Sequence, residues 1–500
     1  MFFKRKDQPK DNTDQSAQNQ ADIPAAKDAF LAEMKGRFSN SADFIIKELS
    51  PELSLLYIET LIETTMLNEN IIGALCEPVR SLDQALEQID SGSKNKLDSL
   101  DKTIDALLEG SAIIHFDGIP SVLSANIKTT VDRSLNKPEN ESQVLGPQLA
   151  FIESLNTNLS LIRRYLVNPA LKVETFQLGV RTRSKVSLLF LEGIADDGMI
   201  ATVRQRINDI QIDGILDSSI LLQLIEDNTL SIFPQMVLTE RPDRTCSLLL
   251  EGKLAILTEG SSQAIICPVN FVEFFKSMED QNVRWHIATF LRLLRLFAMQ
   301  ISIFFTAIYV ASLTFHYEII PQPLLVPLSE SRSKVPFPPI FEALLLEFTI
   351  ELLREAGARL PTKVGQTMGI VGGIVVGTAA VQAGFTSNIL IIIIALSALA
   401  SFTTPSYMMG NVIRILRFPL IFLAGFWGFY GLSLGFAFIV IHLVRQSSLG
   451  SPYLAPFYPP RFSYWLDSII RMPLPFTNTR PYQSRPKDMV RYPRDPDQNE

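Results

Sequence analysis

The chain has 500 residues, of which 47% are hydrophobic and only 19% are charged, with a formal net charge of −7. This length exceeds that of one ordinary domain, and a mean hydropathy of +0.19 with so little charge is unusual for a soluble protein. Basic residues form no concentrated stripe, so we expect no nucleic-acid partner. The cysteines and histidines are scattered and no catalytic or phosphate-binding motif is present, so we expect no metal, no cofactor and no enzyme activity.

Apolar residues are concentrated in the second half of the chain. Residues 1–285 carry charge at ordinary density, whereas 364–413 contain no Asp, Glu, Lys, Arg or His. The contrast predicts an α/β or α+β soluble N-terminal region of two subdomains, followed by an all-α multi-span membrane domain. The basic start of the chain is followed by no apolar run, so it does not have the pattern of a secretory signal, and we expect the soluble region in the cytoplasm.

The first soluble subdomain is expected at 25–140, after a polar tail at 1–24 that lacks the apolar residues needed for ordered packing. Residues 54–59 and 111–118 have the pattern of buried strands. Residues 82–89 have that of an amphipathic helix, so the unit is expected to mix strands and helices.

The second soluble subdomain is expected at 141–290. Apolar spacing predicts a helix at 146–166, a strand at 186–193 and a helix at 199–210. At 247–268, three β-rich runs are separated by Glu-Gly pairs, which predicts a β-meander.

The membrane domain is expected at 291–445, and a Pro- and Arg-rich tail at 446–500 without helical periodicity is expected to be extended or loosely folded. A helix needs about 20 apolar residues to cross the hydrocarbon of a bilayer. The candidate spans are 296–315, 364–384, 389–404 and 418–441. The segment 341–359 has the pattern of an amphipathic helix instead.

The number of spans decides on which side the tail lies. Four spans place the basic tail in the cytoplasm, as the positive-inside rule favours, but leave Arg414 and Arg417 on the opposite side. If 341–359 also crosses, these two arginines move inside and the tail moves out. We expect four spans.

The helix at 341–359 carries the first group of candidate functional residues. Glu347, Glu351 and Glu355 repeat every four residues, opposite an apolar face. In a ring-shaped oligomer such carboxylates would gather around an axis and attract cations. The alternative, which is more usual for a charged helical face, is that these carboxylates are solvated or paired within the helix. Arg354 and Arg359 stand at salt-bridge spacing from Glu351 and Glu355. Glu347 has no basic partner at that spacing and is therefore the cleanest probe.

A second group lies on the next apolar segment, where small residues recur at roughly helical spacing and predict close packing against another helix. These are Gly365, Gly369, Gly373 and Gly377, continued by Ala380 and Gly384. Gln366, Thr378 and Gln382 add polar groups to the same helix, and we include them among the candidates for a cation path. For the glycines themselves, packing is the simpler role.

Several motifs occur together along the chain. The string SRSKVPFPPIFEALLLEFTIELLREAGARLPTKVG is followed by VGGIVVGTAAVQAG, and three further strings precede them: FQLGVRTRSKVSLLFLEGIA, FPQMVLTERPDR and LEGKLAILTEGSSQAIICPVNFVEFF. In this order they resemble the A subunit of the spore germinant receptors of endospore-forming bacteria, the GerA family. Gln281 and Asn282 stand where that family has aromatic residues, and Thr378 where Gln is commoner, which leaves the receptor subtype open.

The resemblance implies a subunit of a nutrient receptor in the spore inner membrane. It implies a transporter-like B subunit and a lipoprotein C subunit as partners, with nutrient recognition mainly on the B subunit. It also implies a homo-oligomer whose membrane helices, in contact with lipid, line or gate a cation path.

Two other classes of function remain as alternatives, a stand-alone secondary transporter and a membrane-anchored scaffold or sensor. A transporter is expected to have duplicated, interrupted spans, and the sequence of the apolar segments shows no such duplication. A scaffold would not need the acidic helix.

Overall fold

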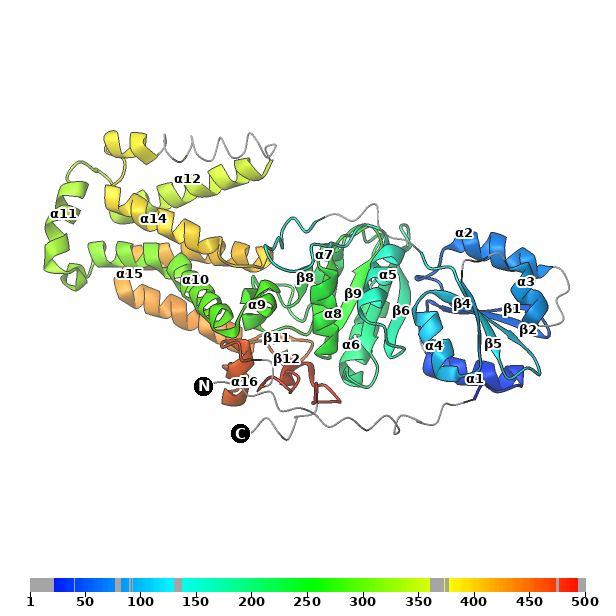
Figure 1. Cartoon of the computed structure of the whole chain (residues 1–500). Coiled ribbons are helices and arrows are strands. Elements are labelled where there is room, and N and C mark those ends of the chain that lie inside the picture. The colour runs from blue at the N-terminus through cyan, green and yellow to red at the C-terminus, as the bar shows by residue number, and fades with distance from the viewer. Residues whose placement is uncertain are drawn as a thin grey trace, which may run out of the picture.

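The computed structural model describes residues 22–39, 41–76, 82–89, 91, 93–129, 137–359, 373, 377–473 and 476–492. Two sheet-containing subdomains lie in a row, and a helical domain extends beyond the second one (Figure 1). Of the tail expected to be flexible, residues 1–21 lie outside the described residues, and Ile23 is buried in the first subdomain.

The first subdomain is a five-stranded antiparallel sheet with helices on both faces. Its strands are β1 (Phe44–Ser50), β2 (Leu53–Ile58), β3 (Lys94–Leu97), β4 (Ser111–Phe116) and β5 (Val122–Asn126), in the order β1-β2-β4-β5-β3. Its helices are α1 (Lys27–Arg37), α2 (Thr64–Met66), α3 (Leu82–Gln88) and α4 (Leu100–Leu108). One apolar cluster packs α1 and α4 on one face, and another packs α3 on the other, which explains why every residue of β4 is buried.

The second subdomain repeats this connectivity. Its strands are β6 (Leu171–Leu178), β7 (Ser184–Leu191), β8 (Val237–Thr239), β9 (Leu254–Thr258) and β10 (Ala264–Cys267), in the order β6-β7-β9-β10-β8. Its helices are α5 (Leu155–Tyr165), α6 (Asp197–Asp209), α7 (Ser218–Ile225) and α8 (Pro242–Leu250). Each subdomain therefore consists of a helix, a hairpin, a helical crossover, a short strand, a helix and a second hairpin.

Two expectations for the second subdomain need correction. The first of the three β-rich runs at 247–268 is not a strand, because Leu248 and Leu249 are buried in the last turn of α8. A short apolar run does not distinguish a strand from a buried helical turn, and Pro242 suits the first turn of a helix. The helix expected from 146 begins only at Leu155, where the Ser154 hydroxyl accepts a hydrogen bond from the Thr157 amide (3.5 Å).

A buried ion pair joins the two subdomains. Arg163 of α5 donates to both carboxylate oxygens of Asp43, at 2.9 and 2.8 Å, and Ser41 and Thr60 donate to the same carboxylate. Burial raises the pKa of Asp43, but the charge and hydrogen bonds of Arg163 together with the hydrogen bonds from Ser41 and Thr60 outweigh burial and hold it below its ordinary value. The ionised pair fixes one subdomain against the other.

Among its described residues, the helical domain contains two helices that are long and apolar enough to cross a membrane, judged by length and composition. These are α10 (Trp285–Thr314) and α15 (Tyr407–Arg445). The other helices are the short α9 (Glu279–Asn282), α11 (Gln322–Arg332), α12 (Pro339–Arg359) and the shorter apolar α14 (Asn388–Ser401). Most of the expected span 364–384 lies outside the described residues.

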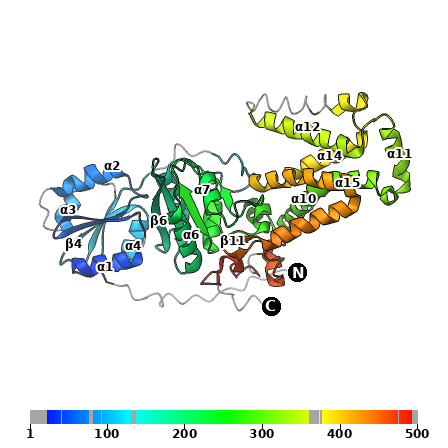
Figure 2. The same cartoon turned by 180° about the vertical axis from the view of Figure 1, so that it is seen from behind.

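The expected span 418–441 is not one continuous helix. Gly428 has φ 59° and ψ −138°, and the two parts of α15 fold back on each other there, as Figure 2 shows. A Cβ atom at Gly431 would lie 2.1 Å from the carbonyl oxygen of Leu423, so glycine permits the close return of the chain. A continuous apolar run conceals such a break.

The expectation of a loosely folded C-terminal segment is wrong for the described residues 446–473 and 476–492. It contains the hairpin β11 (Ser447–Ser448) and β12 (Ser451–Pro452), the helix α16 (Phe462–Ser468) and a 3-10 helix at Tyr482–Ser484. It lies against the second subdomain (Figure 1), where Ser448 donates to the carbonyl of Gln235 at 2.7 Å and Arg480 donates to that of Leu250 at 2.9 Å. Polar contacts of this kind leave no periodic signal in a sequence.

Candidate functional site in the helical domain

Helix α12 presents its apolar side to the outside and its acidic side to the other helices. Phe341, Phe348 and Leu352 are 64%, 58% and 54% exposed, whereas Glu342 and Glu347 are each 1% exposed. In water the hydrophobic effect would favour the reverse arrangement. This distribution suits a helix whose outer face contacts lipid and whose ionisable groups face the interior of a bundle.

Glu347 lies where four helices meet. Its carboxylate is 3.0 Å from Arg417 of α15 and accepts a hydrogen bond from Thr306 of α10 at 2.8 Å. Arg417 is also 1% exposed and donates to the Ser302 hydroxyl of α10 (2.7 Å) and the Ser397 carbonyl of α14 (3.1 Å). The charges of α12 and α15 are therefore compensated inside the bundle, in a network that contacts α10 and α14.

As expected, Glu347 has no basic partner at helical spacing within α12, but it is paired with Arg417 of α15 and is therefore not an unpaired probe of a cation path. Its partner is 70 residues away in the sequence, so the spacing along one helix does not reveal it. In the sequence, Arg414 and Arg417 stand out only as charges on the side of the membrane that the positive-inside rule disfavours. An ionisable residue within an apolar membrane segment needs a partner of opposite charge. This rule could have indicated from the sequence that Arg417 pairs with a carboxylate such as Glu347.

The neighbouring carboxylates of α12 also link helices. Glu342 accepts hydrogen bonds from the Thr386 hydroxyl (3.0 Å) and the Ser387 amide (2.5 Å) at the start of α14. Glu351 lies 3.4 Å from Arg354 and 3.5 Å from Arg414 of α15. These contacts hold α12 against α14 and α15.

The end of α12 carries the exposed pair of Glu355 and Arg359, whose charged atoms are 2.6 Å apart. Both side chains are mostly exposed, at 65% and 78%. The expected pairings of Arg354 with Glu351 and of Arg359 with Glu355 are thus present, and of the three candidate carboxylates on α12, Glu355 is the one open to the surroundings.

The candidates on the following segment are only partly described. Gly365, Gln366 and Gly369 lie outside the described residues. A Cβ atom added at Gly373 or Gly377 would have no described atom within 4 Å, so no described part of this chain packs closely on these glycines. Thr378 and Gln382 are exposed.

Gly384 ends this segment in a conformation that requires glycine. Its φ is +71°, and a Cβ atom there would lie 2.8 Å from the carbonyl oxygen of Lys334. In the described part of the chain, Gly384 therefore approaches the connection between α11 and α12, and not another helix.

Charged residues fix both ends of the helical domain to the second subdomain. Arg295, in the first turns of α10, donates to the carbonyl of Phe275 in the second subdomain at 3.2 Å, and the fully buried Asp280 of α9 lies 3.1 Å from Arg292 and 2.9 Å from Arg295. Asp227 accepts hydrogen bonds from the Ser447 hydroxyl (2.5 Å) and the Gly450 amide (3.1 Å), just after α15. Burial raises the pKa of Asp227, but these bonds and the charge of Arg206 outweigh burial and lower it. These contacts attach the second subdomain to the start of α10 and to the chain just after α15.

Comparison with known proteins gives one consistent result. The family model described as Bacillus/Clostridium GerA spore germination protein matches residues 32–483. The chain is 44% identical over 475 residues to spore germination protein GerQA of Bacillus cereus, which covers 94% of this chain and 95% of that protein. It is 39% identical over 477 residues to spore germination protein KA of Bacillus subtilis (strain 168), with coverages of 93% and 88%.

Among solved structures, the crystal structure of the N-terminal domain of the A subunit of the Bacillus megaterium spore germinant receptor GerK3 is similar to this chain. The alignment covers 51% of this chain and 99% of that chain, with 26% identity and a TM-score of 0.39.

Proposed function

Because this chain belongs to the GerA family of spore germination proteins, we propose that it is the A subunit of a nutrient germinant receptor, whose copies assemble to form or gate a cation path. Its relatives are spore germination proteins, so a role in germination follows from the family. In the proposed receptor it works in the spore inner membrane with a transporter-like B subunit and a lipoprotein C subunit.

The observation that carries the membrane part of this proposal is the reversed polarity of α12. The exposed Phe and Leu side chains of α12 are accompanied by exposed apolar side chains on α10, α14 and α15. Representative residues are Phe297, Ile308, Leu396, Leu399, Phe422, Phe438 and Ile441. Apolar groups spread over a whole domain favour lipid as its surroundings.

The position of the C-terminal segment supports an even number of crossings. The segment contacts the second subdomain, and so does the start of α10. Two parts in contact lie on the same side of a membrane, so the soluble region and the tail share one side. The basic residues of the tail favour the cytoplasm as that side.

Assembly into an oligomer would use the outward surface near Gly373 and Gly377. Small residues without a close neighbour among the described residues of their own chain allow the backbone of a second copy to approach. In such a ring, Glu355 is the α12 carboxylate that remains accessible, while Glu347 stays paired with Arg417. Carboxylates gathered around an axis raise the local concentration of cations.

The test uses spores that lack their own receptors and carry this chain with its B and C partners. Cation release and loss of refractility are recorded after a nutrient mixture is added. We expect no response when this chain alone is omitted. We also expect Glu355→Gln to slow cation release, because it removes one charge per subunit from the path.

Arg359→Gln is the matched control, because it breaks the same exposed pair without removing a carboxylate. Release slowed equally by both variants would assign the effect to the lost pair and not to a cation path. A full response without this chain would contradict its role as a receptor subunit.

A further inference from the structure

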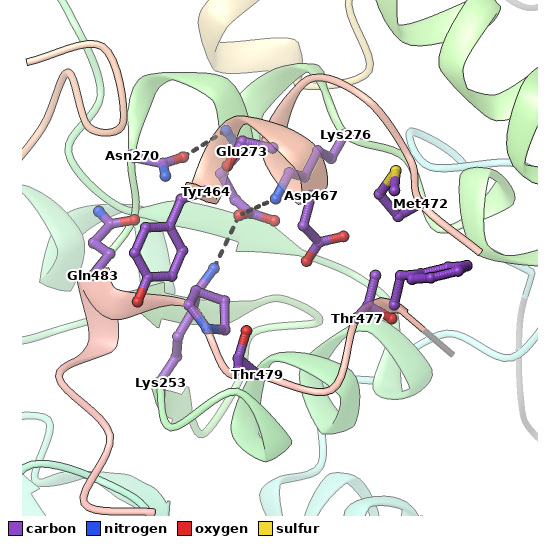
Figure 3. A pocket seen from close by; sticks show the side chains of 13 residues that line it. Lys253, Asn270, Glu273, Lys276, Tyr464, Asp467, Met472, Thr477, Thr479 and Gln483 are labelled. Carbon is purple, nitrogen blue, oxygen red and sulfur yellow. Dashed lines mark hydrogen bonds and ion pairs between the residues drawn. The ribbon is translucent and has the colours of Figure 1, made fainter. Parts of the chain in front are cut away.

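A cavity lies where the C-terminal segment covers the second subdomain (Figure 3). It encloses about 220 Å³, whereas one water molecule takes only about 10–15 Å³ by this measure. A molecule of several non-hydrogen atoms therefore fits. The subdomain contributes Lys253, Asn270, Glu273 and Lys276 to the walls, and the C-terminal segment contributes Tyr464, Asp467 and Gln483.

The wall from the second subdomain carries excess positive charge. The ammonium groups of Lys253 and Lys276 lie 3.0 and 3.5 Å from the same oxygen of Glu273, so two positive charges face one carboxylate. Figure 3 shows both lysines directed at Glu273. The next carboxylate, Glu251, is 3.7 Å from Lys253 but is itself paired with Arg491 at 2.7 Å. A negatively charged group is favoured beside this wall.

The wall from the C-terminal segment adds a donor and an acceptor. Gln483 is 6% exposed, and its amide nitrogen is buried without a hydrogen-bond partner among the described residues. Burying a donor without an acceptor is costly, so this nitrogen favours an oxygen atom in the cavity. Asp467 of α16 lies across the cavity from Gln483 in Figure 3. Its carboxylate is a hydrogen-bond acceptor and lies 3.7 Å from Arg471.

We propose that this cavity binds a small carboxylic acid that has a hydroxyl or another hydrogen-bond donor at its far end. The carboxylate of the ligand accepts from Lys276 and Gln483, and the donor faces Asp467. Only a single negative charge suits the site, because Glu273 and Asp467 repel a second one. The cavity stands apart from the proposed cation path, and its occupancy does not depend on that proposal.

Binding there would hold the C-terminal segment on the second subdomain at the root of α10. The backbone carbonyl of Asp467 accepts a hydrogen bond from Arg292 of α10 at 2.8 Å. The amide of Arg471 donates to the hydroxyl of Thr289, also in α10, at 3.1 Å. A ligand that joins both walls therefore stabilises the contact between α16 and the first turns of this helix.

The test is calorimetric titration of the purified full chain in detergent with lactate, a carboxylate with a neighbouring hydroxyl. We expect a dissociation constant of about 1 mM, which is ordinary for so few atoms. Lactamide has the same shape without the charge, and we expect it to bind at least about tenfold more weakly. Equal binding of the two compounds, or no heat with lactate up to about 20 mM, would overturn the proposal.

Variants locate the site. We expect Lys276→Gln and Gln483→Leu each to weaken lactate binding about tenfold, because each removes a donor to the carboxylate. Lys487→Gln is the control, since Lys487 belongs to the same segment but pairs with Asp197 at 2.7 Å and does not line the cavity. Unchanged binding in both cavity variants, or an equal loss in the control, would contradict this location. Binding of inorganic phosphate as tight as that of lactate would overturn the ligand class.

Discussion

The buried pair of Glu347 and Arg417 predicts how the helical domain responds to the loss of one charge. Arg417→Met keeps an unbranched apolar chain but removes contacts to Glu347 (3.0 Å), Ser302 (2.7 Å) and the Ser397 carbonyl (3.1 Å). Glu347 keeps the hydrogen bond from Thr306 but loses its counter-charge. Removing one member of a buried pair typically costs about 3–5 kcal/mol, and we expect a loss of that size in the free energy of unfolding.

The double variant Glu347→Gln with Arg417→Met separates charge from packing. No charge is then buried at the site, so we expect the free energy of unfolding to return to within about 1–2 kcal/mol of the wild-type value. Arg359→Gln is the control, because it breaks an exposed pair on the same helix and should cost less than about 1 kcal/mol. The assay is denaturant titration of the wild type, both single variants of the pair, the double variant and Arg359→Gln in one detergent, followed by tryptophan fluorescence.

Two results would refute this reasoning. Arg417→Met could prove no more destabilising than Arg359→Gln, which would mean that the charge of Glu347 is solvated. Alternatively, the double variant could lose the sum of the two single losses, which would mean that the two side chains act independently and do not form a pair.

Three further predictions concern other parts of the chain. Asp227→Asn should destabilise the protein by about 1–3 kcal/mol near pH 7. The pKa of Asp227 is lowered from 3.8 in the folded state, so its contribution to stability is present above that value and is lost as the pH falls through the folded pKa. Unfolding curves of variant and wild type should therefore converge in acid, and a difference independent of pH would contradict the linkage. Gly428→Ala should destabilise the protein by more than about 1 kcal/mol, since φ is 59° and a Cβ atom would lie 2.6 Å from His316. Gly410→Ala should be neutral or stabilising, because no described atom lies within 4 Å of its Cβ position. Thermal unfolding compares the two variants, and equal effects would contradict the turn at Gly428. Burial raises the pKa of Cys246 and Cys267 to about 12, so neither thiol should react with iodoacetamide near pH 8 until the chain is unfolded, and mass spectrometry of labelled peptides from the native protein would reveal any exception.

The strands and helices of the soluble region were predictable where their apolar residues repeat with one clear period. The buried strand at 111–118 and the helix at 199–210 correspond to β4 and α6. The duplicated connectivity was not predictable, because it depends on which strands pair, and pairing leaves no trace in local periodicity. The run at 247–250 was misassigned because four apolar residues suit a strand and a buried helical turn equally well.

The candidate site was predictable in its residues but not in its arrangement. The acidic repeat of α12 and its two local ion pairs follow from spacing along a single helix. The direction in which the helix faces depends on Arg417 and Thr386, which lie on other elements. The break at Gly428 was hidden for a related reason, since a hydropathy pattern records composition and carries no information on the sign of φ.

The central claim, that copies of this chain assemble in a membrane and pass cations, is tested most directly by ion flux from vesicles that contain only the purified chain. Potassium and chloride permeabilities are measured for the wild type, for Gly373→Leu and for the control Ile374→Leu. We expect potassium to pass much faster than chloride through the wild type and the control, and Gly373→Leu to abolish both assembly and flux, because a leucine side chain holds apart two helices that pack through glycine. Equal flux through all three proteins, or a wild-type protein that remains monomeric and impermeable, would contradict the account.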